Sequence, residues 1–189
     1  MLGSLPTELT VNGKTYPIRS DYRDVLRIIQ AFSATDLDDR EKIIVCMRQL
    51  YCHLEDIPAE DIPAAYEAAI RFIEYLPDDG KKTPRTINWE KDETLIFPAI
   101  NQAAGTEVRA LEYLHWWTFL GYFQSIDRES TWGAVLTIRQ KRARHKKLES
   151  WEQEFYNSNR AICELDTPQD RKTRQEDAIR EMQRRLLGG

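Results

Sequence analysis

Residues 114–123 read Leu114-His115-Trp116-Trp117-Thr118-Phe119-Leu120-Gly121-Tyr122-Phe123, and they are apolar on nearly every side. A helix that is apolar all round must be enclosed by protein. The stretch is too short to span a bilayer, which takes about twenty apolar residues, and charged sequence flanks it. We therefore predict a central helix from about Glu107 to Ser125, whose core side chains are Leu114, Trp116, Trp117, Phe119, Leu120 and Phe123.

The composition is that of a soluble globular protein rich in helices. Hydrophobic residues make up 41% and charged residues 31% of the 189 residues, and 8 glycines and 8 prolines are few for a loop-rich β protein. The net charge of −4 argues against a surface built as a whole for nucleic acid. Three cysteines cannot all pair within one chain, and no segment is long and apolar enough for a membrane helix. We expect reduced thiols, no membrane contact and a cytoplasmic location.

Two alternating segments predict an N-terminal β-hairpin. Residues 8–11 and 14–19 alternate apolar and polar side chains around Asn12-Gly13, a dipeptide that accepts the positive φ angles of a type I′ turn. A hairpin alone is marginal in water, so we expect it to pack on the helix that follows. Apolar spacing predicts three helices, over about 20–32, 38–54 and 61–76. Residues 1–76 should therefore form a subdomain of a hairpin and three helices.

The strongest break in the chain is residues 77–86, where prolines flank an Asp-Gly turn. We predict a linker there and a second, helical subdomain over residues 87–165. Its helices are expected at 89–103, with a kink at Pro98, at 107–125 and at 132–155. Residues 166–189 are predicted as a charged C-terminal helix. The expected fold class is mainly α, an N-terminal β-hairpin plus helices followed by a helical C-terminal subdomain with a long basic helix.

Residues suited to catalysis or metal binding are sparse. Cys52 and His53 are adjacent, so on a helix their side chains point about 100° apart and cannot readily pair. Together with Cys46 they do not match the ligand spacing of a zinc site. His115 has no nucleophile or carboxylate partner in its sequence surroundings, and no glycine-rich phosphate loop occurs. We expect a protein that is not an enzyme and that has no cofactor and no metal site.

The run of residues 139–147 most resembles a binding element. Its candidate partner-binding cations are Arg139, Lys141, Arg142, Arg144, Lys146 and Lys147. We favour a solvated face or an acidic protein partner over nucleic acid, because the overall charge is negative and no DNA-binding motif surrounds the run. The aromatic residues Trp132, Trp151 and Phe155 flank it, and each is either an exposed anchor for a partner or a side chain that closes the core.

The order of several motifs resembles that of a known phage family. The motifs are Trp89-Glu90-Lys91-Asp92, Ile96-Phe97-Pro98-Ala99-Ile100-Asn101, Leu114-His115-Trp116-Trp117-Thr118-Phe119 and Ile138-Arg139 before a basic helix. Over about residues 8–160 the chain resembles the tail assembly chaperone family of long-tailed phages and prophages of Gram-positive bacteria. Members of that family are small proteins encoded beside the tape measure gene.

The resemblance implies a non-enzymatic protein that binds the tape measure protein and helps recruit tail tube subunits in the cytoplasm of the infected or lysogenic host. Apolar grooves and a charged surface suit that task. Self-association into a homo-oligomer stays open. Two other functions remain: a nucleic-acid-binding phage regulator that uses the basic run, and a structural tail completion protein that stays in the particle.

Overall fold

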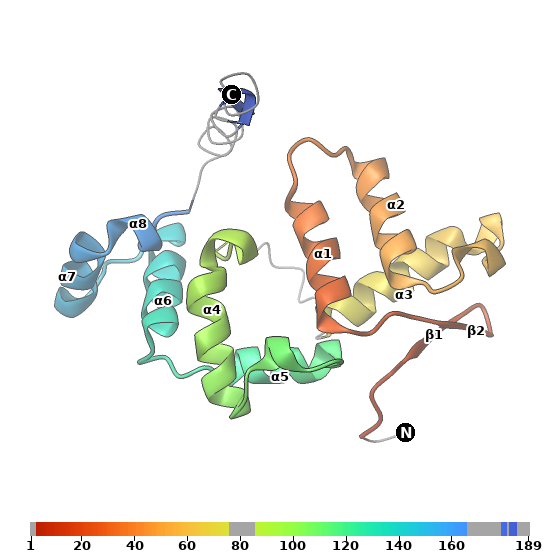
Figure 1. Ribbon diagram of the computed structural model, residues 1–189, viewed down its shortest axis with the longest axis horizontal. Helices are drawn as coiled ribbons and strands as arrows, with labels where there is room; N and C mark the ends of the chain where they lie inside the picture. The colour runs from red at the N-terminus through yellow and green to blue at the C-terminus, as the bar shows by residue number, and fades with distance from the viewer. Residues whose placement is uncertain (1–2, 76–85, 166–178, 181, 185–189) are drawn as a thin grey trace.

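The computed structural model describes residues 3–75, 86–165, 179–180 and 182–184, and it is mainly helical with an N-terminal β-hairpin, as predicted (Figure 1). The element bounds are β1 Glu8–Val11, β2 Lys14–Pro17, α1 Tyr22–Ser33, α2 Asp39–Leu50, η1 Leu54–Asp56, η2 Ala59–Asp61, α3 Ile62–Glu74, α4 Trp89–Ala104, η3 Val108–Ala110, α5 Trp116–Gln124, α6 Thr131–Ala143, α7 Ser150–Ser158 and α8 Arg160–Cys163. Among the described residues, no helix has the length and hydrophobicity needed to cross a membrane.

The hairpin has the predicted turn but a different support. β1 and β2 pair antiparallel, with Leu9 opposite Tyr16, and the turn residues Asn12 and Gly13 have φ angles of 48° and 85°. Two consecutive positive φ angles are those of a type I′ turn. The hairpin packs on α3 rather than on α1, and the Asn12 amide donates a hydrogen bond of 2.6 Å to Asp61 just before that helix. The predicted support by the following helix is therefore wrong.

Side-chain caps fix where the first helices begin. Asp21 accepts a hydrogen bond from the backbone N–H of Arg23, and Asp38 forms a reciprocal capping box with Glu41. α2 ends at Leu50, earlier than the predicted residue 54. The chain turns there because the N–H of Cys52 bonds to the carbonyl of Pro17, so the segment after α2 pairs with the end of the hairpin.

The aromatic helix is shorter than predicted. Residues 108–110 form η3, and α5 begins only at Trp116. The cause is tertiary: Leu114 and His115 run alongside the segment before α1, where the N–H of Tyr22 bonds to the Leu114 carbonyl at 3.0 Å and the N–H of Trp116 bonds to the Ser20 carbonyl at 2.8 Å. His115 then caps α5, because its Nδ1 accepts the N–H of Trp117.

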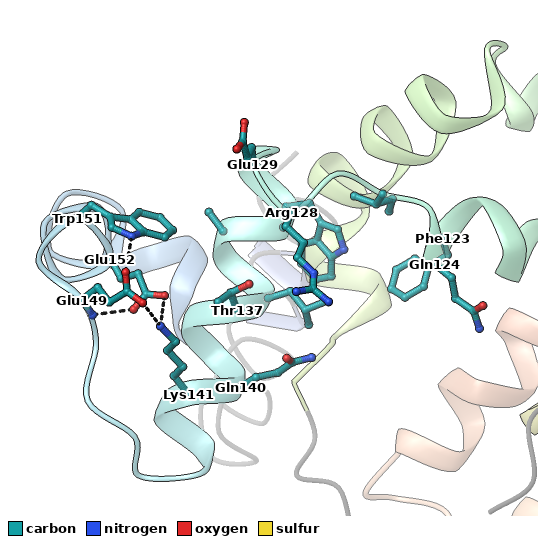
Figure 2. A pocket seen from close by; sticks show the side chains of 15 residues that line it. Phe123, Gln124, Arg128, Glu129, Thr137, Gln140, Lys141, Glu149, Trp151 and Glu152 are labelled. Atoms are coloured by element: carbon teal, nitrogen blue, oxygen red, sulfur yellow. Dashed lines mark hydrogen bonds and ion pairs between the residues drawn. The ribbon is translucent and has the colours of Figure 1, made fainter.

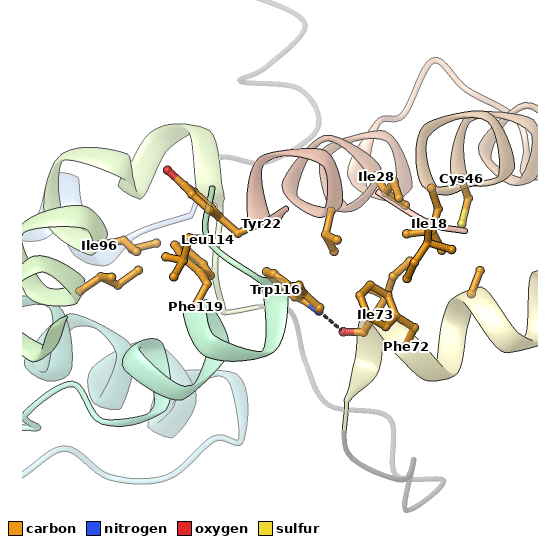
Figure 3. Close-up of a cluster of buried hydrophobic side chains, with 14 of the residues drawn as sticks. Ile18, Tyr22, Ile28, Cys46, Phe72, Ile73, Ile96, Leu114, Trp116 and Phe119 are labelled. Atoms are coloured by element: carbon orange, nitrogen blue, oxygen red, sulfur yellow. Dashed lines mark hydrogen bonds between the residues drawn. The ribbon is translucent and has the colours of Figure 1, made fainter. Parts of the chain in front are cut away.

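The six side chains predicted for the core of the aromatic segment differ in burial. Leu114, Trp116 and Phe119 are buried, and Trp117, Leu120 and Phe123 are partly buried against the same cluster. Figure 3 shows the Trp116 indole reaching α3, where its N–H donates a bond of 2.8 Å to the Ile73 carbonyl. The Phe119 ring stacks on Tyr22 of α1 at 4.5 Å between ring centroids.

One cluster of buried side chains therefore joins the helices before residue 75 to those after residue 86. The predicted linker at 77–86 lies, except for Thr86, outside the described residues, so the division into subdomains stays a prediction. The predicted C-terminal helix over 166–189 also lies outside them, apart from residues 179–180 and 182–184, which are helical.

The predicted long basic helix is two helices. α6 ends at Ala143, and His145 has a φ of 53°, a left-handed conformation that interrupts the helix. α7 starts anew at Ser150, where Glu149 and Glu152 form a capping box. Lys141 bonds to both of these carboxylates, at 3.2 and 2.6 Å, and so fastens the start of α7 to the last turn of α6.

Candidate partner-binding groove

Arg139 belongs to the core, so its expected role as a partner-binding cation is wrong. Its guanidinium forms a two-fold ion pair with Asp92 of α4, at 2.6 and 2.8 Å, and the two side chains are only 2% and 1% exposed. It also donates to the carbonyls of Thr86, Ile162 and Cys163. A buried charge with all its donors paired joins α4, α6 and α8 and faces no partner.

Lys141 and Arg142 are likewise engaged within the protein. The hydrogen bond to Glu152 raises the pKa of Lys141, and the hydrogen bonds from Lys141 and Trp151 lower the pKa of Glu149. The Arg142 guanidinium lies 4.2 Å from the centre of the Tyr156 ring, a cation–π contact. These cations stabilise the packing of α7, although Arg142 remains exposed.

Arg144, Lys146 and Lys147 are the exposed remainder of the basic run. Their side chains have no hydrogen-bond or ion-pair partner within the part of the chain that the structure describes. They follow the C-terminal end of α6, where positive charges interact favourably with the helix dipole. Of the basic run, these three cations after the end of α6 are therefore the part available to a partner. Their role in binding stays a prediction.

The three flanking aromatic side chains differ in exposure. Trp132 is buried, with 1% exposed, and Phe155 is partly buried against the core. Trp151 is 50% exposed, although its indole N–H bonds to Glu149. Of the three, Trp151 has the exposure that a binding anchor needs.

Trp132 and Trp151 both line a groove between the end of α5, one face of α6 and the start of α7. Figure 2 shows this groove with Trp151 beside Glu149 and Glu152. The groove has a volume of about 900 Å³. Its lining residues are Phe123, Gln124, Ile126, Arg128, Glu129, Trp132, Gly133, Ala134, Leu136, Thr137, Gln140, Lys141, Glu149, Trp151 and Glu152. Apolar, polar and charged side chains are mixed in this lining, and a groove of this kind can receive a helix of another polypeptide.

The groove depends on the break between α6 and α7. In one continuous helix the 19 positions from Trp132 to Trp151 would separate the two side chains by about 28 Å along the axis. The turn after Ala143 instead returns Trp151 to the α6 face that carries Leu136 and Thr137. Leu136 and Thr137 were not predicted to line a groove for this reason, and no local pattern of the sequence marks Arg128 as a lining residue.

Gly133 also supports the groove. A Cβ atom at this position would lie 2.5 Å from the carbonyl oxygen of Asp127 and 2.6 Å from Cα of Arg128, which is closer than backbone atoms allow. The segment before α6 therefore passes directly over Gly133, and this close approach positions Arg128 at the edge of the groove.

The candidate catalytic residues are not brought together. Cys46 is buried, and burial raises the pKa of its thiol to about 12, which keeps it protonated and unreactive. His53 is exposed and lies 3.6 Å from Glu55. His115 is buried and bonds through Nε2 to the Pro6 carbonyl. Within the described residues, no group of three or more His, Cys, Asp or Glu side chains could hold a metal ion.

A family model described as Bacteriophage Gp15 protein matches residues 1–165. The chain belongs to the bacteriophage Gp15 protein family. Comparisons with curated proteins and with solved structures found no match.

Membership of the bacteriophage Gp15 family makes this a phage protein. The matched range includes the hairpin, every element from α1 to α8 and the whole groove. Three residues of the motifs that carry the sequence resemblance have defined contacts: Asp92 and Arg139 form the buried ion pair, and Asn101 accepts the N–H of Val108 at the start of η3.

Proposed function

We propose that this member of the Gp15 family is a phage tail assembly chaperone, which binds the tape measure protein and helps recruit tail tube subunits in the host cytoplasm without catalysis. Family membership gives the phage context. The resemblance over residues 8–160 supports a role in the tail. The single observation that carries the mechanism is the groove beside α6, with the half-exposed Trp151 at its edge.

The groove matches the requirement of such a chaperone. A client that is long, helical and apolar is kept in solution when its apolar face is covered. Phe123, Leu136 and Trp151 supply apolar surface, while Arg144, Lys146 and Lys147 keep the neighbouring surface charged and hydrated. Binding of this kind is reversible and needs no bond to be made or broken.

Co-expression with the tape measure protein encoded in the same phage tests the proposal. We expect the tape measure protein to be insoluble alone and to co-purify with this chain when the two are made together. Trp151→Ala should lower the captured amount several-fold, since exposed aromatic anchors contribute most to such interfaces. Ile44→Ala is the matched control, because Ile44 is a 41%-exposed apolar side chain on α2, away from the groove.

Two readouts separate the alternative functions. A chaperone should be absent from purified phage particles, whereas a tail completion protein would remain in them. A nucleic-acid-binding regulator would bind duplex DNA with an affinity that falls steeply with salt and that depends on Arg144, Lys146 and Lys147. Failure to capture the tape measure protein, together with DNA binding at physiological salt, would refute the proposal.

A further inference from the structure

The turn that follows α6 has a defined backbone. The N–H of Lys146 bonds to the carbonyl of Lys141 at 2.8 Å, and the N–H of His145 bonds to the carbonyl of Arg142 at 3.0 Å. Together with the left-handed conformation of His145, these two bonds form a Schellman motif, which is a common end of a helix. The side chains of this turn are therefore presented from a hydrogen-bonded surface.

Positive charge gathers on this turn without a matching acid. We use the name basic turn for its four exposed cations, Arg142, Arg144, Lys146 and Lys147. The nearby carboxylates are engaged, since Glu149 and Glu152 pair with Lys141 and Glu164 pairs with Arg160. Among the described acids of α7, Glu154 is left without a partner. The basic turn therefore has more positive charge than its surroundings neutralise.

Arg142 is held in place while its donors stay unused. Its guanidinium lies 4.2 Å from the centre of the Tyr156 ring, and that ring is itself fixed, because it is buried and its hydroxyl donates a bond of 2.6 Å to Glu164. No described residue accepts a hydrogen bond from the Arg142 side chain. Packing on the ring restricts the guanidinium, so little freedom is lost when its paired N–H groups bind the two oxygens of a carboxylate.

We propose that the basic turn is a docking site for an acidic segment of a partner protein, in which one carboxylate pairs with Arg142 and neighbouring carboxylates meet Arg144, Lys146 and Lys147. None of these four cations lines the groove, so the two surfaces are separate. The inference goes beyond the proposed function, in which these cations keep the surface charged and hydrated.

The charge of the whole chain favours an acidic protein segment over nucleic acid. Binding to DNA depends on cations spread along the phosphate backbone and weakens steeply as salt rises. Here the cations occupy one short turn, and the chain carries a net charge of −4, so the rest of its surface repels a long polyanion. A short acidic segment needs contacts with the turn alone.

Two fluorescein-labelled peptides test the proposal. They share their length and their glycine and serine residues, and one carries glutamate where the other carries glutamine. We expect the full-length protein to bind the glutamate peptide at least about tenfold more tightly at physiological ionic strength in a fluorescence-polarisation titration, because the amides offer no charge to the cations. Added salt should weaken the binding, since the contacts are exposed.

Reversal of charge in the turn tests its location. Lys146→Glu/Lys147→Glu should weaken binding of the glutamate peptide by at least about tenfold. Arg40→Glu/Arg48→Glu is the matched control, because it makes the same change in net charge at two exposed positions of α2, away from α6 and α7 (Figure 1). The control should leave the affinity within about twofold, since salt screens charges that lie more than about 8 Å apart.

Arg142→Lys separates a positioned guanidinium from charge alone. The variant keeps the positive charge but loses the planar pair of donors, so we expect about threefold to fivefold weaker binding of the glutamate peptide. Arg144→Lys is the matched control and should change the affinity little, because no described ring packs on Arg144. Circular dichroism of each variant establishes that it is folded.

Equal affinity for the two peptides, unchanged binding by Lys146→Glu/Lys147→Glu, or an equal loss in the α2 control would overturn this inference. Arg142→Lys that binds as the parent does would overturn the role of the guanidinium. Duplex DNA of mixed sequence that binds more tightly than the glutamate peptide at the same salt would also overturn it. Capture of the tape measure protein is a separate measurement, and its failure would refute the proposed function while leaving this docking site in place.

Discussion

Removal of the Arg139 guanidinium is the sharpest test of how the helices of this protein are held together. In Arg139→Met the Asp92 carboxylate keeps its backbone bond from Asn88, at 2.9 Å, but loses both bonds to the guanidinium while only 1% exposed. The carbonyls of Thr86, Ile162 and Cys163 lose a donor as well.

Breaking one partner of a buried ion pair costs about 3–5 kcal/mol, because the remaining charge is neither paired nor hydrated. A typical domain has about 5–15 kcal/mol of total stability, so the loss should be large. We expect urea unfolding, followed by tryptophan fluorescence and circular dichroism, to have its midpoint at a much lower urea concentration than in the parent. The dependence of the unfolding free energy on urea concentration should be similar in the two proteins.

The double variant Asp92→Asn/Arg139→Met should be less destabilised than the sum of the single variants, since it leaves no isolated charge. Arg144→Met is the matched control and should change stability by less than about 0.5 kcal/mol, because Arg144 is exposed and unpaired among the described residues. A loss below about 1 kcal/mol for Arg139→Met would refute the buried-pair reasoning, as that value is typical of a surface pair.

Three further predictions follow from the packing and the titrating groups. Trp116→Ala should destabilise the fold by about 3–5 kcal/mol in the same unfolding assay, because it empties a fully buried site and removes the bond to Ile73; a variant as stable as the parent would place the ring at the surface. Burial raises the pKa of Tyr51 to about 12, so the stability contributed by this group should be fully present below a pH of about 10 and fall as the pH rises toward 12. Tyr51→Phe should reduce that slope and leave the part due to Cys46 and to the other thiol and phenol groups whose pKa is raised, while an unchanged slope would contradict the assignment. Lys146→Glu/Lys147→Glu should keep the far-ultraviolet circular dichroism spectrum of the parent, since exposed positions tolerate such changes, and loss of helix signal would show that these cations are structural.

The sequence predicted the elements whose signals are local. Asn12-Gly13 predicted the hairpin turn, and the helix predicted from about residue 38 begins at Asp39, after the cap Asp38. Gly105 ends α4 in the left-handed conformation, with a φ of 68°. The aromatic segment was also predicted to contribute to the core, because a segment with two adjacent tryptophans among apolar residues is expected to be buried by protein.

The errors occurred where tertiary contacts override helical periodicity. Leu114 and His115 have helical spacing but pair with the segment before α1, and the basic run has helical composition but is interrupted at His145. The first break follows from a partner distant in sequence, Ser20, so no local signal marks it. At the second, Glu149 and Glu152 form the capping box that starts α7, and Lys141 of α6 bonds to both carboxylates.

The candidate site was predicted only in part for the same reason. Trp151 was identified as an anchor candidate from its type, but the groove beside it exists because α7 folds back on α6. Arg139 was assigned to the surface because it opens a basic run, and only the position of Asp92 on α4 shows that it is buried. A charge 47 positions from its partner cannot be paired from a single sequence.

Hydrogen–deuterium exchange of the complex with the tape measure protein tests the central claim most directly, because it reports which amides the client covers. Binding at the groove predicts new protection of residues 123–129, 133–140 and 149–152, with little change in α2 and α3. Protection confined to α2 and α3, with the groove segments exchanging as in the free protein, would contradict the account.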